Sequence, residues 1–179
     1  LLNDTNAAWE RQTAPPDLLT AISSTAFDLP RVLDTVIAHA TRLADAENGF
    51  LYPADGDLLR MSATYGEKAG VMQNWQVDHP IRGDYTGSST GRAFTDGRTV
   101  HIPDVTADAN YTYAEAQRLG GFKTLLSVPL RREGRTPGGI SMWPTAPPPF
   151  TDEQIAPVRT FADPARIAIG KVPPLHAPA

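Results

Sequence analysis

The stretch FKTLLSVPL, which begins at Phe122, limits the possible folds more than any other part of the chain. Successive side chains of a β-strand point to opposite faces of the sheet. Leu125 therefore lies on one face, and the other face carries Leu126, Val128 and Leu130. Apolar residues on both faces are typical of a strand that is covered from two sides. We expect a sheet that lies between two other layers of the domain.

Three further segments read as strands of this sheet. Residues 138–144 are expected to pair with the strand FKTLLSVPL across the turn RREGRTPG. Asp55-Gly56-Asp57 is a turn signature between two short apolar runs, which predicts a hairpin. The run RTVHIPDV, residues 98–105, predicts an edge strand, because Pro103 cannot donate to a sheet ladder.

The clearest helix signal spans residues 28–49. Apolar residues recur there at spacings of three and four, which places them on one stripe of a helix. Asp28 is a suitable N-cap, Pro30 is tolerated in the first turn, and Asn48-Gly49 can end the helix. The stripe consists of Leu29, Val32, Leu33, Val36, Ile37, Ala40, Leu43 and Ala44.

Shorter helices are expected over residues 66–80, from Gly91 to Phe94, and over residues 112–119. In the last of these, Thr112 and Glu115 have the spacing of a capping box.

A closing helix begins after Thr151, which has Gln154 three residues later and so also fits a capping box. Pro157 and Pro164 each remove a backbone donor, so the pattern predicts a kink in this helix.

The segment LGGFKT resembles a phosphate-binding loop only superficially. Such a loop follows a strand, precedes a helix, and joins glycine directly to lysine. Here a helix precedes the glycines, a strand follows them, and Phe122 separates Gly121 from Lys123. We therefore predict that Gly120-Gly121 ends a helix, where a positive φ is favourable.

Composition narrows the function further. The chain has 179 residues, a net charge of −4 and no cysteine. One domain is expected at this length. The mild negative charge is not that of a nucleic-acid-binding surface, and no apolar run reaches the ~20 residues that span a bilayer. The absence of cysteine excludes disulfides, thiolate metal sites and thiol nucleophiles within this sequence, and we expect a cytoplasmic protein.

Residues 10–52, 97–134 and 149–163 resemble a GAF domain of the type found in bacterial sensor histidine kinases and cyclases, with HIPDV and GGFKTLLSVPL as the most specific segments. The resemblance implies an α+β fold with a central antiparallel sheet of about six strands. Helices would cover one face, and short helices and loops would enclose a pocket on the other. We expect an N-terminal linker over residues 1–14, the GAF domain over 15–171, and a proline-rich tail over 172–179.

The function that this resemblance implies is sensory and not catalytic. The domain would bind an unidentified small molecule, relay to a histidine kinase or cyclase output domain, and form a homodimer through its helices. A dimerisation module without a physiological ligand is the alternative. We expect no nucleic-acid or membrane partner, no catalytic residue and no metal site. The candidate ligand-binding residues are Phe50, Tyr52, Met61, His101, Tyr111, Tyr113, Phe122, Thr124 and Met142.

The cofactor is left open by the sequence. Covalent bilin attachment needs a cysteine, as does the chemistry of the GAF-type enzymes that reduce free methionine sulfoxide, and this sequence has none. The residue set of cyclic-nucleotide-binding relatives cannot be placed here. Haem would need an axial ligand, for which His101 is the best of the histidines, although its strand position fits a half-exposed residue equally well. The sequence therefore supports neither haem nor a cyclic nucleotide as the cofactor.

Overall fold

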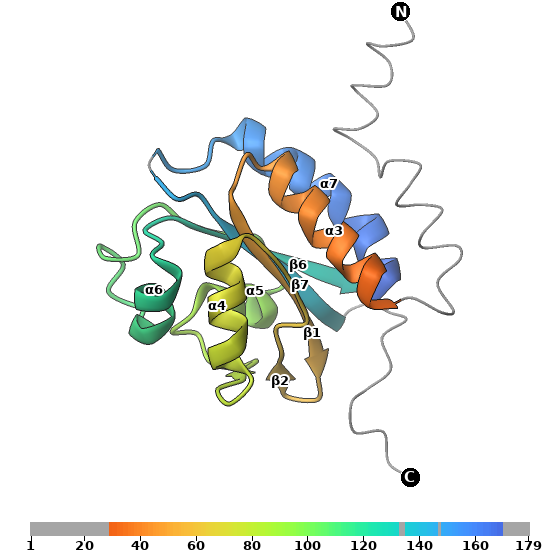
Figure 1. Ribbon diagram of the computed structural model, residues 1–179, viewed down its shortest axis with the longest axis horizontal. Helices are drawn as coiled ribbons and strands as arrows, with labels where there is room; N and C mark the ends of the chain where they lie inside the picture. The colour runs from red at the N-terminus through yellow and green to blue at the C-terminus, as the bar shows by residue number, and fades with distance from the viewer. Residues whose placement is uncertain (1–28, 133–134, 147, 170–179) are drawn as a thin grey trace, which may run out of the picture.

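The computed structural model describes residues 29–132, 135–146 and 148–169. The expected N-terminal linker and proline-rich tail lie outside these residues, and so does the middle of the RREGRTPG turn. Both hydrophobic clusters of the described chain pack against one central sheet. The sheet separates two layers of helices (Figure 1).

Every strand pair in the sheet is antiparallel, and the strand order is β4-β2-β1-β7-β6-β5, with β3 paired to β1 outside this path. The long central strands are β1 (Asn48–Asp55), β7 (Arg135–Trp143) and β6 (Leu125–Arg132). The short strands are β2 (Leu58–Leu59), β3 (Ala63–Tyr65), β4 (Ile81–Arg82) and β5 (Val100–Ile102). The predicted antiparallel α+β fold is therefore confirmed.

Two long helices, α3 (Leu29–Leu43) and α7 (Asp152–Ile169), lie side by side on one face of the sheet (Figure 1). We call this side of the sheet the helix face. Most of the apolar stripe predicted for α3 is buried there, with Val36 and Ile37 fully covered and Leu43 partly buried. The even-numbered residues Leu126, Val128 and Leu130 of β6 pack against the two helices. This cluster contains only apolar side chains.

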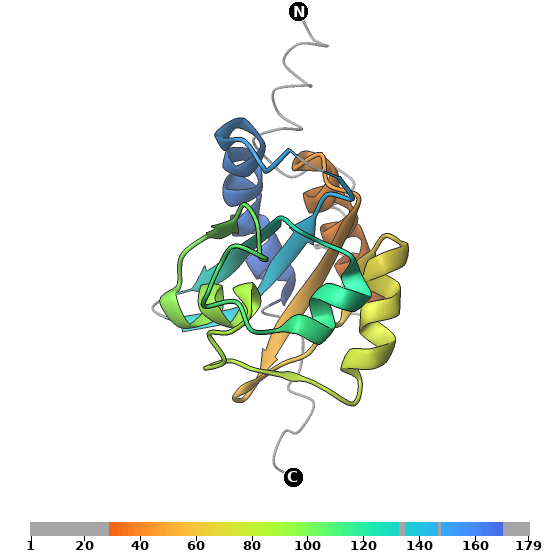
Figure 2. The same ribbon diagram turned by 90° about the vertical axis from the view of Figure 1, so that its left-hand side faces the viewer.

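The opposite side, which we call the pocket face, carries three short helices, α4 (Glu67–Gln76), α5 (Ser89–Asp96) and α6 (Ala114–Gly120). Figure 2 views the molecule from this side, with α4 and α6 in front of the central strands. Phe50, Leu125 and Trp143 point to this face from the three central strands. The prediction that β6 would be covered on both sides is confirmed.

The helix ends support part of the sequence interpretation. Thr151 and Gln154 form the expected capping box, because the Thr151 amide donates to Gln154 Oε1 at 2.9 Å and the Gln154 amide donates to Thr151 Oγ1 at 3.2 Å. Gly121 follows α6 with a φ of 64°, as a left-handed helix end requires.

One expectation about the helices differs from the structure. Thr112 does not cap α6: the residue before that helix is Tyr113, and the Thr112 hydroxyl bonds the Tyr85 hydroxyl instead. The closing helix α7 continues across both Pro157 and Pro164, so neither proline ends it, and the expected kink stays a prediction. Burial of its apolar residues against the sheet, Val158 among them, offsets the lost backbone donors.

Candidate functional site

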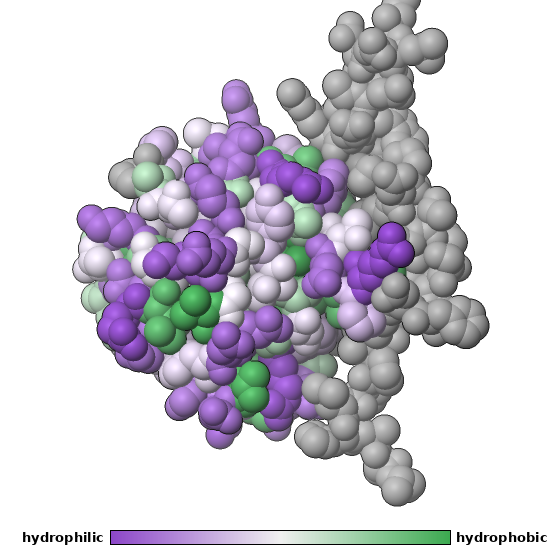
Figure 3. All heavy atoms as spheres, viewed as in Figure 1, coloured by the Kyte–Doolittle hydropathy of each residue, from purple (hydrophilic) through white to green (hydrophobic). Residues whose placement is uncertain are grey.

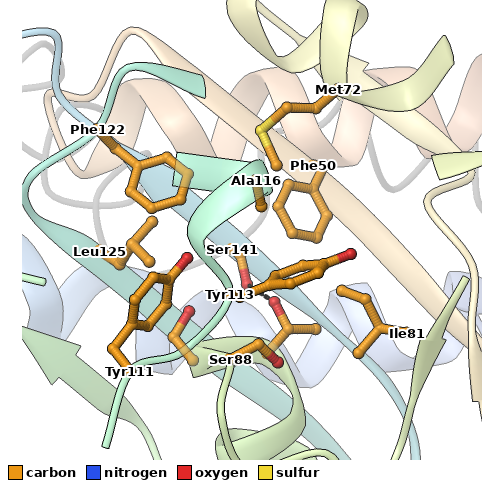
Figure 4. Close-up of a pocket in the computed structure, with 12 residues that line it drawn as sticks. Phe50, Met72, Ile81, Ser88, Tyr111, Tyr113, Ala116, Phe122, Leu125 and Ser141 are labelled. Atoms are coloured by element: carbon orange, nitrogen blue, oxygen red, sulfur yellow. Dashed lines mark hydrogen bonds between the residues drawn. The ribbon is translucent and has the colours of Figure 1, made fainter. Parts of the chain in front are cut away.

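A hollow lies on the pocket face, between the central strands, the start of α5 and the loop that leads into α6. Four aromatic rings surround it (Figure 4), those of Phe50, Tyr111, Tyr113 and Phe122. Four aliphatic side chains complete the apolar wall, those of Met72, Ile81, Ala116 and Leu125. The remaining wall consists of hydroxyls, those of Ser88, Ser89, Thr90 and Ser141.

The free space in the hollow is small. Its total empty volume, including the open mouth, is about 280 Å³, but only about 20 Å³ has room for the centre of a water-sized molecule. A cavity of ~10–15 Å³ on this second measure holds one water. The side chains therefore leave space for about one water, and any larger guest requires the rings at the mouth to move.

Three hydroxyls of the wall, those of Ser89, Thr90 and Ser141, form a buried chain with Ser127. Ser89 Oγ lies 2.9 Å from Ser127 Oγ, which lies 2.6 Å from Ser141 Oγ. The chain ends at Thr90 Oγ1, 3.0 Å from Ser141 Oγ. All four side chains are at least 97% buried. Polar side chains are rare in a core, and these join α5 to β6 and β7.

The loop over the hollow is fixed by polar contacts with the segment that precedes α5. The Thr112 amide donates to the Gly87 carbonyl at 2.9 Å, and the Thr112 and Tyr85 hydroxyls lie 2.7 Å apart. Arg92 Nη1 donates to Asp108 Oδ2 at 3.0 Å. Hydrogen bonds and an ion pair therefore fix the rim of the loop, and the rings of Tyr111 and Tyr113 also pack against neighbouring aromatic side chains.

Burial raises the pKa values of three tyrosines on the pocket face. Desolvation raises the pKa of Tyr113 to about 12, and the neighbouring Gln76 amide limits the rise. Desolvation also raises the pKa values of Tyr111 and Tyr52. All three phenols are therefore protonated at neutral pH. The Tyr52 hydroxyl lies beside Ser141 and over Gly139, where a Cβ atom would collide with it.

The structure brings four of the expected ligand-binding residues to the hollow: Phe50, Tyr111, Tyr113 and Phe122. Tyr52 and Met61 belong to the same apolar cluster without lining the hollow. Thr124 is buried, and its hydroxyl donates to the Pro103 carbonyl at 2.8 Å. It therefore holds the loop to the start of β6.

Two of the expected residues lie on the wrong side of the sheet. Met142 packs in the apolar cluster under α3 and α7. His101 pairs in register with Leu126, which faces the same way, and its ring is 5.8 Å from that of Phe150. Burial lowers the His101 pKa, against the opposing effect of Asp152. The placement of His101 and Met142 beside the pocket is thus corrected, because strand alternation turns them to the helix face.

The sequence interpretation missed the hydroxyl chain. The available signal was in the strands, where Ser127 and Ser141 each lie between apolar neighbours. A serine between two apolar residues of a strand places a hydroxyl on one face of a buried sheet, where apolar side chains are usual.

The described residues contain no cluster of three histidine, aspartate or glutamate side chains that could hold a metal ion. None of the helices within the described ranges is long and apolar enough to cross a membrane.

The fold is similar to those of several solved structures. One is the type II free methionine-R-sulfoxide reductase of Thermoplasma acidophilum, at 19% identity and a TM-score of 0.62, with 80% of this chain and 96% of that chain covered. Another is the GAF domain of an Acinetobacter phosphoenolpyruvate-protein phosphotransferase, at 13% identity and a TM-score of 0.69, with 93% of each chain covered. The GAF-B domain of DevS from Mycobacterium smegmatis has 22% identity and a TM-score of 0.58, with 79% and 93% covered.

None of the curated proteins matches this chain. The family model of the GAF domain matches residues 27–170, which include both helices of the helix face and every element around the hollow. The chain therefore belongs to the GAF domain family.

Proposed function

We propose that this chain is the sensory module of a cytoplasmic bacterial signalling protein and binds a small molecule in the hollow beneath the loop of Tyr111 and Tyr113. The observation that carries the proposal is the combination of aromatic walls, buried hydroxyls and a loop fixed by polar contacts. Small-molecule sites combine an apolar lining with a few placed polar groups in this way.

The sheet offers a direct path from the hollow to the helix face. Ser141 lines the hollow, while its neighbours Ile140 and Met142 pack under α3 and α7. A ligand that moves the backbone of β7 at Ser141 therefore moves side chains against both helices. The helices would relay this shift to a histidine kinase or cyclase output domain. Such a relay requires that the ligand bind one conformation of the domain more tightly than the other.

Binding fits the hollow better than catalysis. Two of the similar structures are enzymes that act on free methionine-R-sulfoxide. The lining of the present hollow contains no histidine, carboxylate or lysine that could serve as a base for its hydroxyls. The sequence also supplies no cysteine.

A thermal-shift screen against nucleotides, haem, amino acids and aromatic metabolites tests the proposal, because a ligand of the folded state raises the melting temperature. The variant Ala116→Met fills the hollow from its wall and should abolish the shift. Ala114→Met is the matched control, because Ala114 lies on the same helix and is exposed. A shift that persists in Ala116→Met would place the ligand elsewhere.

The small free volume favours one second candidate, a dimerisation module whose hollow stays filled by its own side chains. The helix face is the natural place for a second copy. Sedimentation over a range of concentrations separates the two functions. A concentration-dependent dimer, together with no thermal shift by any compound, would favour the second candidate.

A further inference from the structure

The wall of the hollow is uncharged. Its twelve residues comprise aromatic, aliphatic and hydroxyl side chains, and none carries an ionisable acid or base apart from the two tyrosine phenols. Burial keeps those phenols protonated by raising their pKa values. A charged group that enters such a space loses its hydration and gains no partner of opposite charge, which costs several kcal/mol.

The hydroxyl chain has one hydrogen to spare. Each hydroxyl donates one hydrogen, so the four hydroxyls of Ser89, Ser127, Ser141 and Thr90 have four, while the three bonds between them use three. The Tyr52 hydroxyl beside Ser141 has no hydrogen-bond partner among the described residues, so it does not use this hydrogen. Three of the four chain hydroxyls line the hollow, all except Ser127. When the spare hydrogen is on one of these three, the hollow offers a donor that a guest molecule or a water can accept.

The ion pair of Arg92 and Asp108 lies beside the hollow, and each of its charges already has a partner. Arg92 does not line the hollow, and its guanidinium donates to Asp108 and to the Thr86 carbonyl. Its Nη2 atom is buried and has no hydrogen-bond partner among the described residues. This atom is the one place near the loop where a ligand carboxylate could be attracted, so the experiment below includes a carboxylate.

Resting on the proposed function, we infer that the ligand is an uncharged molecule with a flat ring and an oxygen that accepts a hydrogen bond from the hydroxyl chain. The ring lies among Phe50, Phe122 and the two tyrosines, as Figure 4 shows for the space between them. The oxygen replaces the single water for which the hollow has room. Because the free space holds about one water, the rings at the mouth must move to admit the ring of the ligand.

Three probes of similar size test this inference by isothermal titration calorimetry. Acetophenone has a ring and a neutral carbonyl, isopropylbenzene replaces the carbonyl by hydrocarbon, and benzoate replaces the methyl group by a charged oxygen. We expect acetophenone to bind about 5-fold more tightly than isopropylbenzene, which is the value of one net hydrogen bond. We expect it to bind at least about 30-fold more tightly than benzoate, which must bury an unpaired charge.

A triple variant assigns the preference to the hydroxyl chain. Ser89→Ala with Thr90→Val and Ser141→Ala removes every hydroxyl of the chain that lines the hollow and should make acetophenone and isopropylbenzene bind equally. Binding of isopropylbenzene by this variant shows that it is folded and that its hollow is intact. Ser62→Ala with Thr160→Val is the matched control, because both residues are exposed, and it should keep the 5-fold preference.

The possible failures are distinguishable. Binding of benzoate as tight as that of acetophenone would overturn the inference, point to Arg92, and leave the proposed function intact. A preference that survives in the triple variant would also overturn it. The inference fails alone if none of the three probes binds while another compound raises the melting temperature, and it fails together with the proposed function if no compound of any kind binds.

Discussion

The two faces of the sheet are built from alternate residues of the same strands, yet they differ in chemistry. Ile140 and Met142 of β7 face a mainly apolar layer under two long helices, with Thr41 and His101 as polar side chains on that face, whereas Ser141 between them faces hydroxyls and a hollow. The helix face is closed mainly by apolar packing. On the pocket face, hydroxyls occupy positions that apolar side chains fill on the helix face, and polar contacts fix the loop over the hollow. The difference indicates that stability resides mainly on the first face and recognition on the second.

Figure 3 adds that hydrophobic residues on the visible surface form small patches among hydrophilic ones. The large exposed hydrophobic side chains among the described residues are Val71, Val77 and Tyr85. All three belong to α4 or to segments between α4 and α5, on the pocket face. In the described part of the two long helices no large hydrophobic side chain is exposed.

The largest effect is expected on the helix face. Ile140 is fully buried there, so Ile140→Ala removes packed methyl groups and leaves a cavity. We expect a loss of about 3 kcal/mol in the free energy of unfolding, measured by urea denaturation. The affinity for a ligand of the hollow should be nearly unchanged, and a loss of binding in the folded variant would break the division between the faces.

The adjacent residue should show the opposite pattern. Ser141→Ala breaks two hydroxyl bonds, to Thr90 and Ser127, and should lower the free energy of unfolding by about 1.5 kcal/mol. The affinity for acetophenone should change more than the affinity for isopropylbenzene, because only acetophenone accepts a hydrogen bond from the hydroxyls of the hollow. A destabilisation larger than that of Ile140→Ala would mean that the pocket face is the more important one for stability.

Acid should loosen the loop before it unfolds the domain. The Arg92 hydrogen bond holds the Asp108 pKa below its ordinary value. A depressed carboxyl pKa stabilises the folded state above the unfolded pKa of about 4, and the contribution is lost as the pH falls through the folded value. Hydrogen-exchange protection of the Tyr111 and Thr112 amides, corrected for intrinsic rates, should therefore fall below pH 4 while α3 stays protected.

The loop holds a second carboxyl that titrates in this range, because hydrogen bonds from Thr106 lower the Asp104 pKa. Asp108→Asn should reduce protection at neutral pH and remove most of the pH dependence. Asp104→Asn should leave both largely as they are. If the two variants behave alike, the Arg92 ion pair is not what holds the loop.

The smallest effect is expected at the rim. Tyr85→Phe removes the hydroxyl that bonds Thr112 at a solvent-exposed position. The free energy of unfolding should change by less than about 0.5 kcal/mol, while exchange at the Thr112 amide should become faster. A change as large as that of Ser141→Ala would show that the loop is part of the global folding unit.

The sequence predicted the fold well where local patterns and packing agree. The stripe of α3, the alternation of β6 and the Thr151 capping box all appear as expected. Local patterns fail where a distant partner decides the outcome: Thr112 has the spacing of a cap, but a tyrosine 27 residues away takes its hydroxyl. The same reason explains the site. The rings were found from composition and loop position, but the hydroxyl chain joins Ser89 to residues 38 and more positions along the chain, which no local pattern reveals.

The side of a strand was the other source of error. His101 and Met142 were assigned to the pocket by proximity in sequence, although one step of alternation moves a side chain to the opposite face. The register of β5 on β6 fixes the face of His101, and that register depends on pairing across the sheet.

The most direct test of the two-face account is a titration of the ¹⁵N-labelled protein with acetophenone, followed by NMR. We predict that amide shifts change first and most strongly at Ser88 to Gly91 and at Tyr111 to Ala116, with smaller changes crossing β7 to α3 and α7. Changes that are largest on α3 and α7, with none around the hollow, would contradict the account.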